Sequence, residues 1–130
     1  MAGWQPGAGA TLLMPSGAGD HLFVVLNDPA VFAGYGARPQ VVLVSLGTVR
    51  PGIPHDPTCV LEPGCHAFVK VESYVVYKRA RIDPLAHVQK LVEQGLFKPL
   101  DAMPPEVFAD IRAGLQVSPF TKGEFRELKI

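Results

Sequence analysis

Short apolar runs separated by glycine and proline are the feature that most constrains this chain. It carries thirteen glycines and thirteen prolines among 130 residues, roughly twice ordinary usage, and they cluster between runs rich in Val, Leu and Tyr. Such clusters favour turns, and the runs between them have the length of strands. The predicted strands are Ala10–Met14, His21–Leu26, Gln40–Leu46, Thr58–Leu61, Phe68–Val71 and Ser73–Ile82.

The apolar pattern also predicts how the strands are buried. Leu22–Leu26 and Val41–Leu46 are apolar without alternation, which is typical of strands covered on both faces. Ser73–Ile82 alternates, so we expect it to be half exposed. Six strands within about 75 residues indicate a small barrel or a coiled sheet. The two predicted faces of the last strand are Tyr74, Val76, Lys78, Ala80 and Ile82, and Val75, Tyr77, Arg79 and Arg81.

The spacing of apolar residues changes at Asp83, where a helix over residues 83–94 is predicted. Asp83 is suited to the N-cap, Pro84 to the first helical position and Gly95 to the position after the end. The apolar face of this helix is Leu85, Val88, Leu91 and Val92.

A second helix is predicted over residues 105–115, beginning at Pro104 or Pro105. Further on, Thr121 stands three residues before Glu124, a spacing that predicts a capping box for a last short helical turn. The apolar face of the second helix is Val107, Phe108, Ile111 and Leu115.

The length fits one domain over residues 1–130, because domains of about 100–150 residues are the commonest. Residues 1–19 carry no charged side chain but are broken by glycine and proline, so we expect a loose N-terminal arm at 1–8 rather than a signal peptide. Residues 9–82 then form the barrel and residues 83–130 a helical C-terminal extension.

Charge and cysteine content narrow the function classes. Twelve basic and twelve acidic residues give zero net charge, so nucleic-acid binding requires a local patch. No apolar run approaches the about 20 residues that span a bilayer, so we expect no membrane association. Two cysteines, Cys59 and Cys65, are too few for a disulfide framework and favour a reduced cytoplasmic setting.

One dense polar cluster raises the question of a metal site or a reactive thiol. Its spacing is poor for zinc, because it lacks a Cys-x-x-Cys pair and Cys65 and His66 are adjacent. A thiolate usually needs a histidine from elsewhere in the chain, such as His21 or His87. We expect no metal, and ordinary thiols in place of a nucleophile. The cluster is His55, Asp56, Cys59, Glu62, Cys65 and His66.

The late strands carry basic residues interleaved with tyrosines. On a sheet, such a set can bind single-stranded RNA, with cations on phosphates and rings stacked on bases. The commoner role is a charged sheet edge that blocks aggregation, and spacing alone does not separate the two. No phosphate-binding loop occurs, and we expect no cofactor. The candidate RNA-binding residues are Lys70, Tyr74, Tyr77, Lys78, Arg79 and Arg81.

The order of these segments resembles the strand plan of the MazF/PemK toxin ribonucleases. In that family an opening strand leads through a variable loop to an "R-P-x-V-V-L-S" strand, then to strands ending in threonine or serine and in "hydrophobic-x-L-x-x-G". The match is one of pattern over residues 9–82. The segments that carry it are Gly9–Met14, Asp20–Asp28, Val41–Thr48, Cys59–Gly64 and Ser73–Ile82.

The resemblance implies an α+β fold, an SH3-like small barrel of five or six strands with two or three C-terminal helices. It also implies a dimeric, metal-independent endoribonuclease hydrolase of a toxin–antitoxin pair that cuts single-stranded RNA. By position, the family's catalytic arginine falls at His21 and its threonine or serine at Thr48, while Arg50 is a candidate phosphate cation. Arg38–Pro39 copies the family dipeptide one strand too late.

Two functions follow as alternatives. The first is the toxin ribonuclease, with an antitoxin protein and a homodimeric partner. The second is a non-enzymatic SH3-like barrel that binds a protein or peptide. If the chain is an enzyme, His21, Thr48 and Arg50 should converge in one groove; in a binding module they should be scattered.

Overall fold

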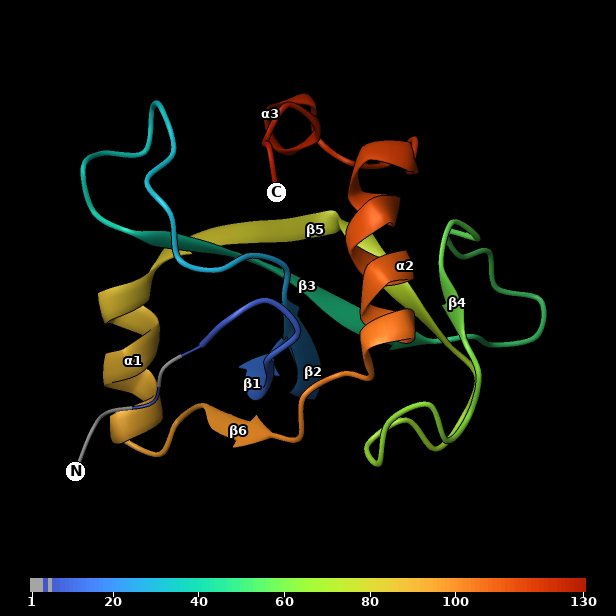
Figure 1. Ribbon diagram of the computed structural model, residues 1–130. Coiled ribbons are helices and arrows are strands. Elements are labelled where there is room, and N and C mark those ends of the chain that lie inside the picture. Colours follow the sequence, from blue (N-terminus) through green and yellow to red (C-terminus); the bar gives the residue numbers. More distant parts are fainter. Residues whose placement is uncertain (1–3, 5) are drawn as a thin grey trace.

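A six-stranded antiparallel sheet, curled into a half-barrel, forms the centre of the computed structural model, which describes residue 4 and residues 6–130 (Figure 1). The strand order is β4-β5-β3-β2-β1-β6. The predicted α+β class and small-barrel architecture are confirmed. The strands are β1 (Thr11–Ser16), β2 (Gly19–Val25), β3 (Gln40–Thr48), β4 (Val60–Leu61), β5 (Ser73–Pro84) and β6 (Lys98–Leu100), and the helices are α1 (Leu85–Glu93), α2 (Pro105–Val117) and α3 (Gly123–Arg126).

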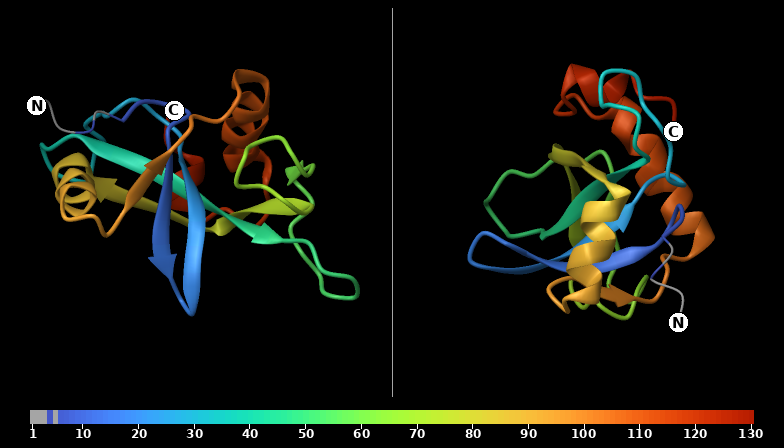
Figure 2. Two further views of the ribbon diagram at one scale, coloured as in Figure 1. Left: turned by 90° about the horizontal axis from the view of Figure 1, so that it is seen from below. Right: turned by 90° about the vertical axis from the view of Figure 1, so that its left-hand side faces the viewer.

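Each face of the sheet packs on a core of its own, as the continuous apolar runs of β2 and β3 predict. The larger core lies under α2 and α3, and the smaller one lies under α1. The two longer helices therefore sit at separate places on the curled sheet (Figure 2). The larger core includes Leu22, Val24, Val44, Val75, Tyr77, Ile111 and Leu115; the smaller includes Leu12, Met14, Phe23, Val25, Leu43 and Val88.

A bulge in β5 changes which of its residues face the core. Ser45 of β3 lies opposite Val76, whereas Leu43 lies opposite Arg81, so β5 carries three extra residues in between. An odd number of extra residues exchanges the two faces of a strand. The predicted alternation therefore holds only as far as Tyr77, and Ala80 and Ile82 face the same core as Tyr77.

One predicted strand is wrong, and one strand of the structure was not predicted. Phe68–Val71 is a loop, not a strand, while Lys98–Leu100 pairs with β1 although no strand was predicted there. β6 has only three residues, all exposed, and one is Pro99, so its sequence carries no strand signal.

Both predicted side-chain caps are wrong. Asp83 belongs to β5 and forms an ion pair with Arg81 at 2.8 Å, and α1 begins only at Leu85. Thr121 does not cap α3; its hydroxyl is buried without a hydrogen-bond partner. By contrast, α2 begins at Pro105 and Gly95 follows α1 with a φ of 75°, as predicted.

The N-terminal stretch is held to the domain wherever the structure describes it. Trp4 packs on the smaller core, and its carbonyl oxygen accepts a hydrogen bond from Gln89 Nε2 at 2.9 Å. The amide of Ala8 donates to Asp28 Oδ1 at 2.9 Å. The expected loose arm is therefore wrong for these residues, and Met1–Gly3 and Gln5 lie outside the described residues.

Tyr77 fixes α2 against the sheet. Its side chain is fully buried, and its hydroxyl donates to the carbonyl oxygen of Ile111 at 2.6 Å. The ring lies against Gly114, where a Cβ atom would overlap the Tyr77 hydroxyl and ring. A glycine in the middle of α2, which weakens a helix, is therefore what lets the helix and β5 approach this closely.

Candidate functional site

The part of the sheet that α1 leaves uncovered carries two adjoining hollows of about 620 and 320 Å³, which we call the basic groove. They share His21 of β2, Tyr74 of β5, and Leu46 and Gly47 of β3. Three neighbouring strands thus form the floor, and the loops that follow β3 and precede β5 form the walls.

The groove brings together all three candidate catalytic residues. His21 comes from the exposed start of β2, Thr48 ends β3 and Arg50 follows in the next loop. Thr48 lies opposite Ser73 in the β3–β5 ladder, so its position is fixed by backbone pairing. These residues lie together because the two strands run antiparallel and their polar ends meet at the same end of the sheet.

Four of the candidate RNA-binding residues line the same groove. Lys70 lies on the loop before β5, Tyr74 on the strand, and Lys78 and Arg79 in the β5 bulge, where both are exposed. Lys78 and Arg79 are both exposed because of the bulge, which turns consecutive residues toward solvent where a regular strand would bury one of them.

The groove is locally basic although the chain is neutral. Its lining includes Arg50, Lys70, Lys78 and Arg79 as cations, with Asp20 as the single carboxylate among the described lining residues. Within the described part of the chain none of these cations is ion-paired. Free cations along a groove attract a phosphate backbone.

Two candidate RNA-binding residues lie elsewhere. Tyr77 is fully buried under α2 and lies outside the lining of the basic groove, so the prediction that it binds RNA in this groove is wrong. Arg81 lies beyond the bulge, outside the groove lining, where Asp83 holds its guanidinium.

An apolar wall also lines the larger hollow and was not predicted. Ile53, Phe68 and Val71 line the larger hollow, and their side chains are 58%, 41% and 51% exposed. Phe68 and Val71 belong to the segment whose apolar character suggested a strand. As a loop, it instead presents exposed apolar side chains to the groove.

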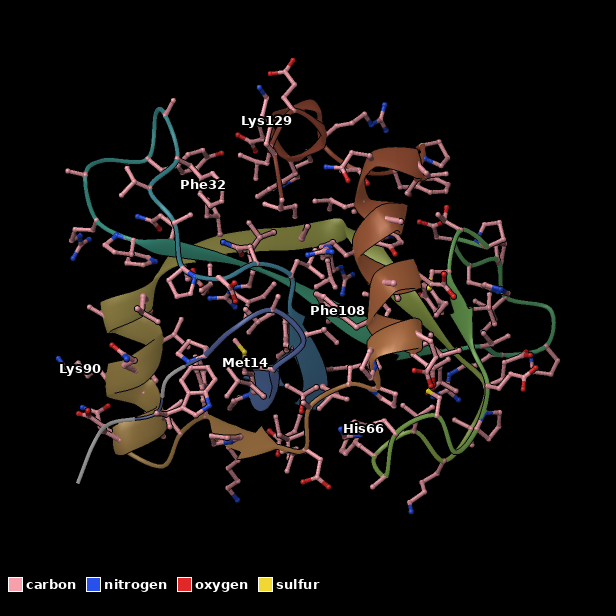
Figure 3. All side chains as sticks on the ribbon, viewed as in Figure 1. Met14, Phe32, His66, Lys90, Phe108 and Lys129 are labelled. Atoms are coloured by element: carbon pink, nitrogen blue, oxygen red, sulfur yellow. The ribbon has the colours of Figure 1, made fainter. Side chains whose placement is uncertain are left out.

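His66 holds this wall in place. Its Nδ1 accepts a hydrogen bond from the Phe68 amide at 3.0 Å, so its Nε2 carries the proton that it donates to the Asp101 carbonyl oxygen at 2.6 Å. The ring is buried and tethers the loop to the segment before α2 (Figure 3). Both nitrogens are occupied, so this histidine is neither free to bind a metal nor paired with a thiol.

Gly47 gives Tyr74 its place on the groove floor. The two residues are opposite each other in the β3–β5 ladder, and a Cβ on Gly47 would lie 2.9 Å from Tyr74 Cε1. The ring therefore lies across the glycine. The centroid of the His55 ring lies 5.2 Å from that of the Tyr74 ring, and the two ring planes are tilted by 41°.

The cysteines carry little nucleophilic character. Both are free thiols; burial raises the pKa of Cys59 above its ordinary value and does the same to Cys65. A raised pKa lowers the thiolate fraction at neutral pH. Across residues 4 and 6–130, no three His, Cys, Asp or Glu side chains are grouped so that they could hold a metal ion.

No family model matches the sequence, and no curated protein matches it. The structure is similar to a chain of the crystal structure of MazE-MazF (Form-II) from Deinococcus radiodurans. The TM-score is 0.53 at 18% sequence identity, over 88% of this chain and 94% of that chain. This likeness is one of fold and supports the MazF-like barrel. None of the helices in the described residues is long and apolar enough to cross a membrane.

Proposed function

We propose that this chain is the toxin of a toxin–antitoxin pair, an endoribonuclease that cuts single-stranded RNA without a metal ion. The observation that carries the proposal is that His21, from the start of β2, lines one basic groove together with Thr48 and Arg50, from the end of β3 and the loop after it. An enzyme requires this convergence and a simple binding module does not. The fold likeness to a chain of a MazE-MazF crystal structure supports the toxin assignment.

The proposed reaction is an internal displacement at phosphorus. The ribose 2′-oxygen attacks the adjacent phosphorus and gives its proton to a base, while the bond to the 5′-oxygen breaks and that oxygen gains a proton from an acid. The products are a 2′,3′-cyclic phosphate and a 5′-hydroxyl. This chemistry needs a proton acceptor, a proton donor and a cation beside the crowded phosphate.

The groove offers a residue for each requirement. An imidazole exchanges protons near neutral pH, so His21 can act as base or acid although the related toxins carry arginine at this place. Arg50 and Lys70 stabilise the charge that develops on the phosphate, and the Thr48 hydroxyl donates a hydrogen bond to it. The apolar wall of Ile53, Phe68 and Val71 holds the bases, while the cations hold the backbone.

The direct test is incubation of the purified chain with a single-stranded RNA in the presence of EDTA. We expect cleavage to persist and the new 3′ ends to carry 2′,3′-cyclic phosphate. Fragments with 3′-hydroxyl ends would reject attack by the 2′-oxygen, and intact RNA would reject the ribonuclease.

A homodimer is part of the proposal. Low charge and short edge strands, with the two-residue β4 at one end of the sheet, favour burial of surface between copies. The apolar face of α1 is not available for the dimer interface, because Val88 is fully buried against the sheet of its own chain. Sedimentation at micromolar concentration should give twice the 14.0 kDa chain mass. A 14.0 kDa species would refute the dimer and weaken the toxin proposal.

A second candidate function is a non-enzymatic barrel that binds a protein or peptide. The exposed apolar wall of Ile53, Phe68 and Val71 favours it, because a groove with apolar and basic sides also suits a peptide with apolar and acidic residues. The EDTA experiment separates the two, since a binding module leaves the RNA intact.

A further inference from the structure

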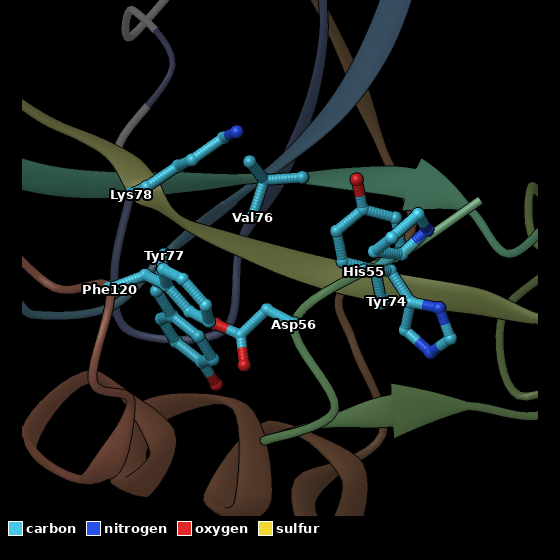
Figure 4. A pocket seen from close by; sticks show the side chains of 8 residues that line it. His55, Asp56, Tyr74, Val76, Tyr77, Lys78 and Phe120 are labelled. Atoms are coloured by element: carbon cyan, nitrogen blue, oxygen red, sulfur yellow. The ribbon is translucent and has the colours of Figure 1, made fainter.

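A separate pocket of about 210 Å³ opens beside the basic groove (Figure 4). The pocket shares Tyr74, Val76 and Lys78 with the smaller hollow of the groove. A nucleic acid bound in the groove therefore passes the opening of the pocket. Asp56, in the loop before β4, and Phe120, in the loop after α2, complete the pocket although they are far apart in the sequence.

The pocket has aromatic rings on opposite sides. Figure 4 shows Phe120 on one side and the pair of His55 and Tyr74 on the other, with Lys78 extending past Val76. Phe120 is 52% exposed, so its ring is accessible to a ligand that enters the pocket. A flat ring entering between them would stack on aromatic faces.

Asp56 supplies a polar group that is fixed in orientation. Oδ1 accepts hydrogen bonds from the amide and hydroxyl of Thr58 at 2.9 and 2.6 Å, and Oδ2 accepts one from the Ser118 hydroxyl at 2.6 Å. Burial alone would raise the pKa of Asp56, but these hydrogen bonds outweigh it and lower the pKa below its ordinary value. The carboxylate is thus ionised at neutral pH. It has room for about one more donor, because a carboxylate accepts about four.

We propose that this pocket binds one nucleobase that is splayed out of the groove and carries an exocyclic amino group. The base stacks between Phe120 and the His55–Tyr74 pair, its amino group donates to Asp56 Oδ2, and Lys78 pairs with the adjoining phosphate. An acceptor-only carboxylate favours the amino group of cytosine over the O4 of uracil. The inference rests on the proposed function, since it needs a nucleic acid in the groove.

A matched pair of uncleavable ligands tests the pocket apart from catalysis. Oligo-dC and oligo-dU of about ten nucleotides lack the 2′-hydroxyl and differ at base positions 3 and 4, where cytosine has an acceptor nitrogen and an amino group and uracil an N–H and a carbonyl oxygen. Fluorescence anisotropy at one fixed salt concentration measures their affinities. We expect the wild-type chain to bind oligo-dC about tenfold more tightly than oligo-dU. Equal affinities, or no binding of either, would overturn the pocket.

Variants assign the preference to the pocket. Phe120→Ala should weaken oligo-dC binding and reduce the tenfold preference to about twofold or less. Val117→Ala is the matched control, since Val117 is 70% exposed on the same segment and outside the pocket. A preference that Phe120→Ala leaves intact would overturn the assignment. Asp56→Asn replaces one carboxylate oxygen with an amide donor and should also reduce the preference for oligo-dC over oligo-dU relative to wild type. Its melting curve checks that the variant is folded.

The same measurements distinguish failure of the pocket from failure of the enzyme. If oligo-dC is preferred and Phe120→Ala abolishes the preference, the pocket stands even where RNA stays intact. If RNA is cut but wild type and Phe120→Ala show the same base preference among the sequenced cleavage sites, the ribonuclease stands and the pocket does not.

Discussion

Replacement of His21 by alanine should lower the rate of single-stranded RNA cleavage by about 100- to 10,000-fold, the range that one general acid or base contributes. The side chain is exposed in the basic groove, so its loss should remove chemistry and little packing. We therefore expect the Tm to be nearly unchanged. Rates are measured under single-turnover conditions with EDTA present, so that substrate binding and product release do not mask the step.

His87→Ala is the matched control for this experiment. His87 is also exposed, but it lies on α1, away from the groove lining. The His87→Ala variant should cut single-stranded RNA at the wild-type rate. Equal cleavage rates for wild type and His21→Ala would show that His21 takes no part in the mechanism, although the chain would still be a ribonuclease.

The largest expected loss of stability comes from Gly114→Ala, with a decrease of about 2–3 kcal/mol in the free energy of unfolding. An added Cβ overlaps the Tyr77 hydroxyl and ring, which are fully buried and hydrogen-bonded to Ile111. Elsewhere in a helix the same change stabilises by about 1 kcal/mol, so the overlap also has to outweigh that gain. Denaturant unfolding followed by circular dichroism measures the change.

Gly123→Ala serves as the control, because nothing lies within 4 Å of a Cβ built at that position of α3. It should leave stability unchanged or raise it slightly. Tyr77→Phe in the Gly114→Ala background should recover part of the loss by removing the overlapping hydroxyl. A Gly114→Ala chain as stable as wild type would mean that α2 can move away from β5 without cost.

Helix α2 and the site are linked through β5. Tyr77, which anchors α2, immediately precedes Lys78 and Arg79, which the bulge turns to solvent. The strand that packs the core thus also carries two of the groove cations. A substitution that shifts β5 in the core would for this reason also shift the basic residues.

Local sequence was enough for the elements whose signals are short-range. The apolar runs at Leu22–Leu26 and Val41–Leu46 predicted strands covered on both faces, and both are buried on two cores. Pro105 at a helix start and Gly95 after a helix end are confirmed, because they depend on backbone conformations that proline and glycine favour by themselves. Six strands within about 75 residues already indicated a small barrel or a coiled sheet, and the resemblance, which used the order of the strands, narrowed this to an SH3-like barrel.

Tertiary structure alone decided where the later residues point. The β5 bulge, set by register against β3, buries Tyr77 and exposes Lys78 and Arg79 together, which no alternating pattern predicts. His66 holds Phe68–Val71 as a loop through Asp101, and Phe120 reaches the pocket of Asp56 through Ser118. Contacts between residues so distant in sequence form only when the whole chain packs, so they cannot be predicted from local propensity.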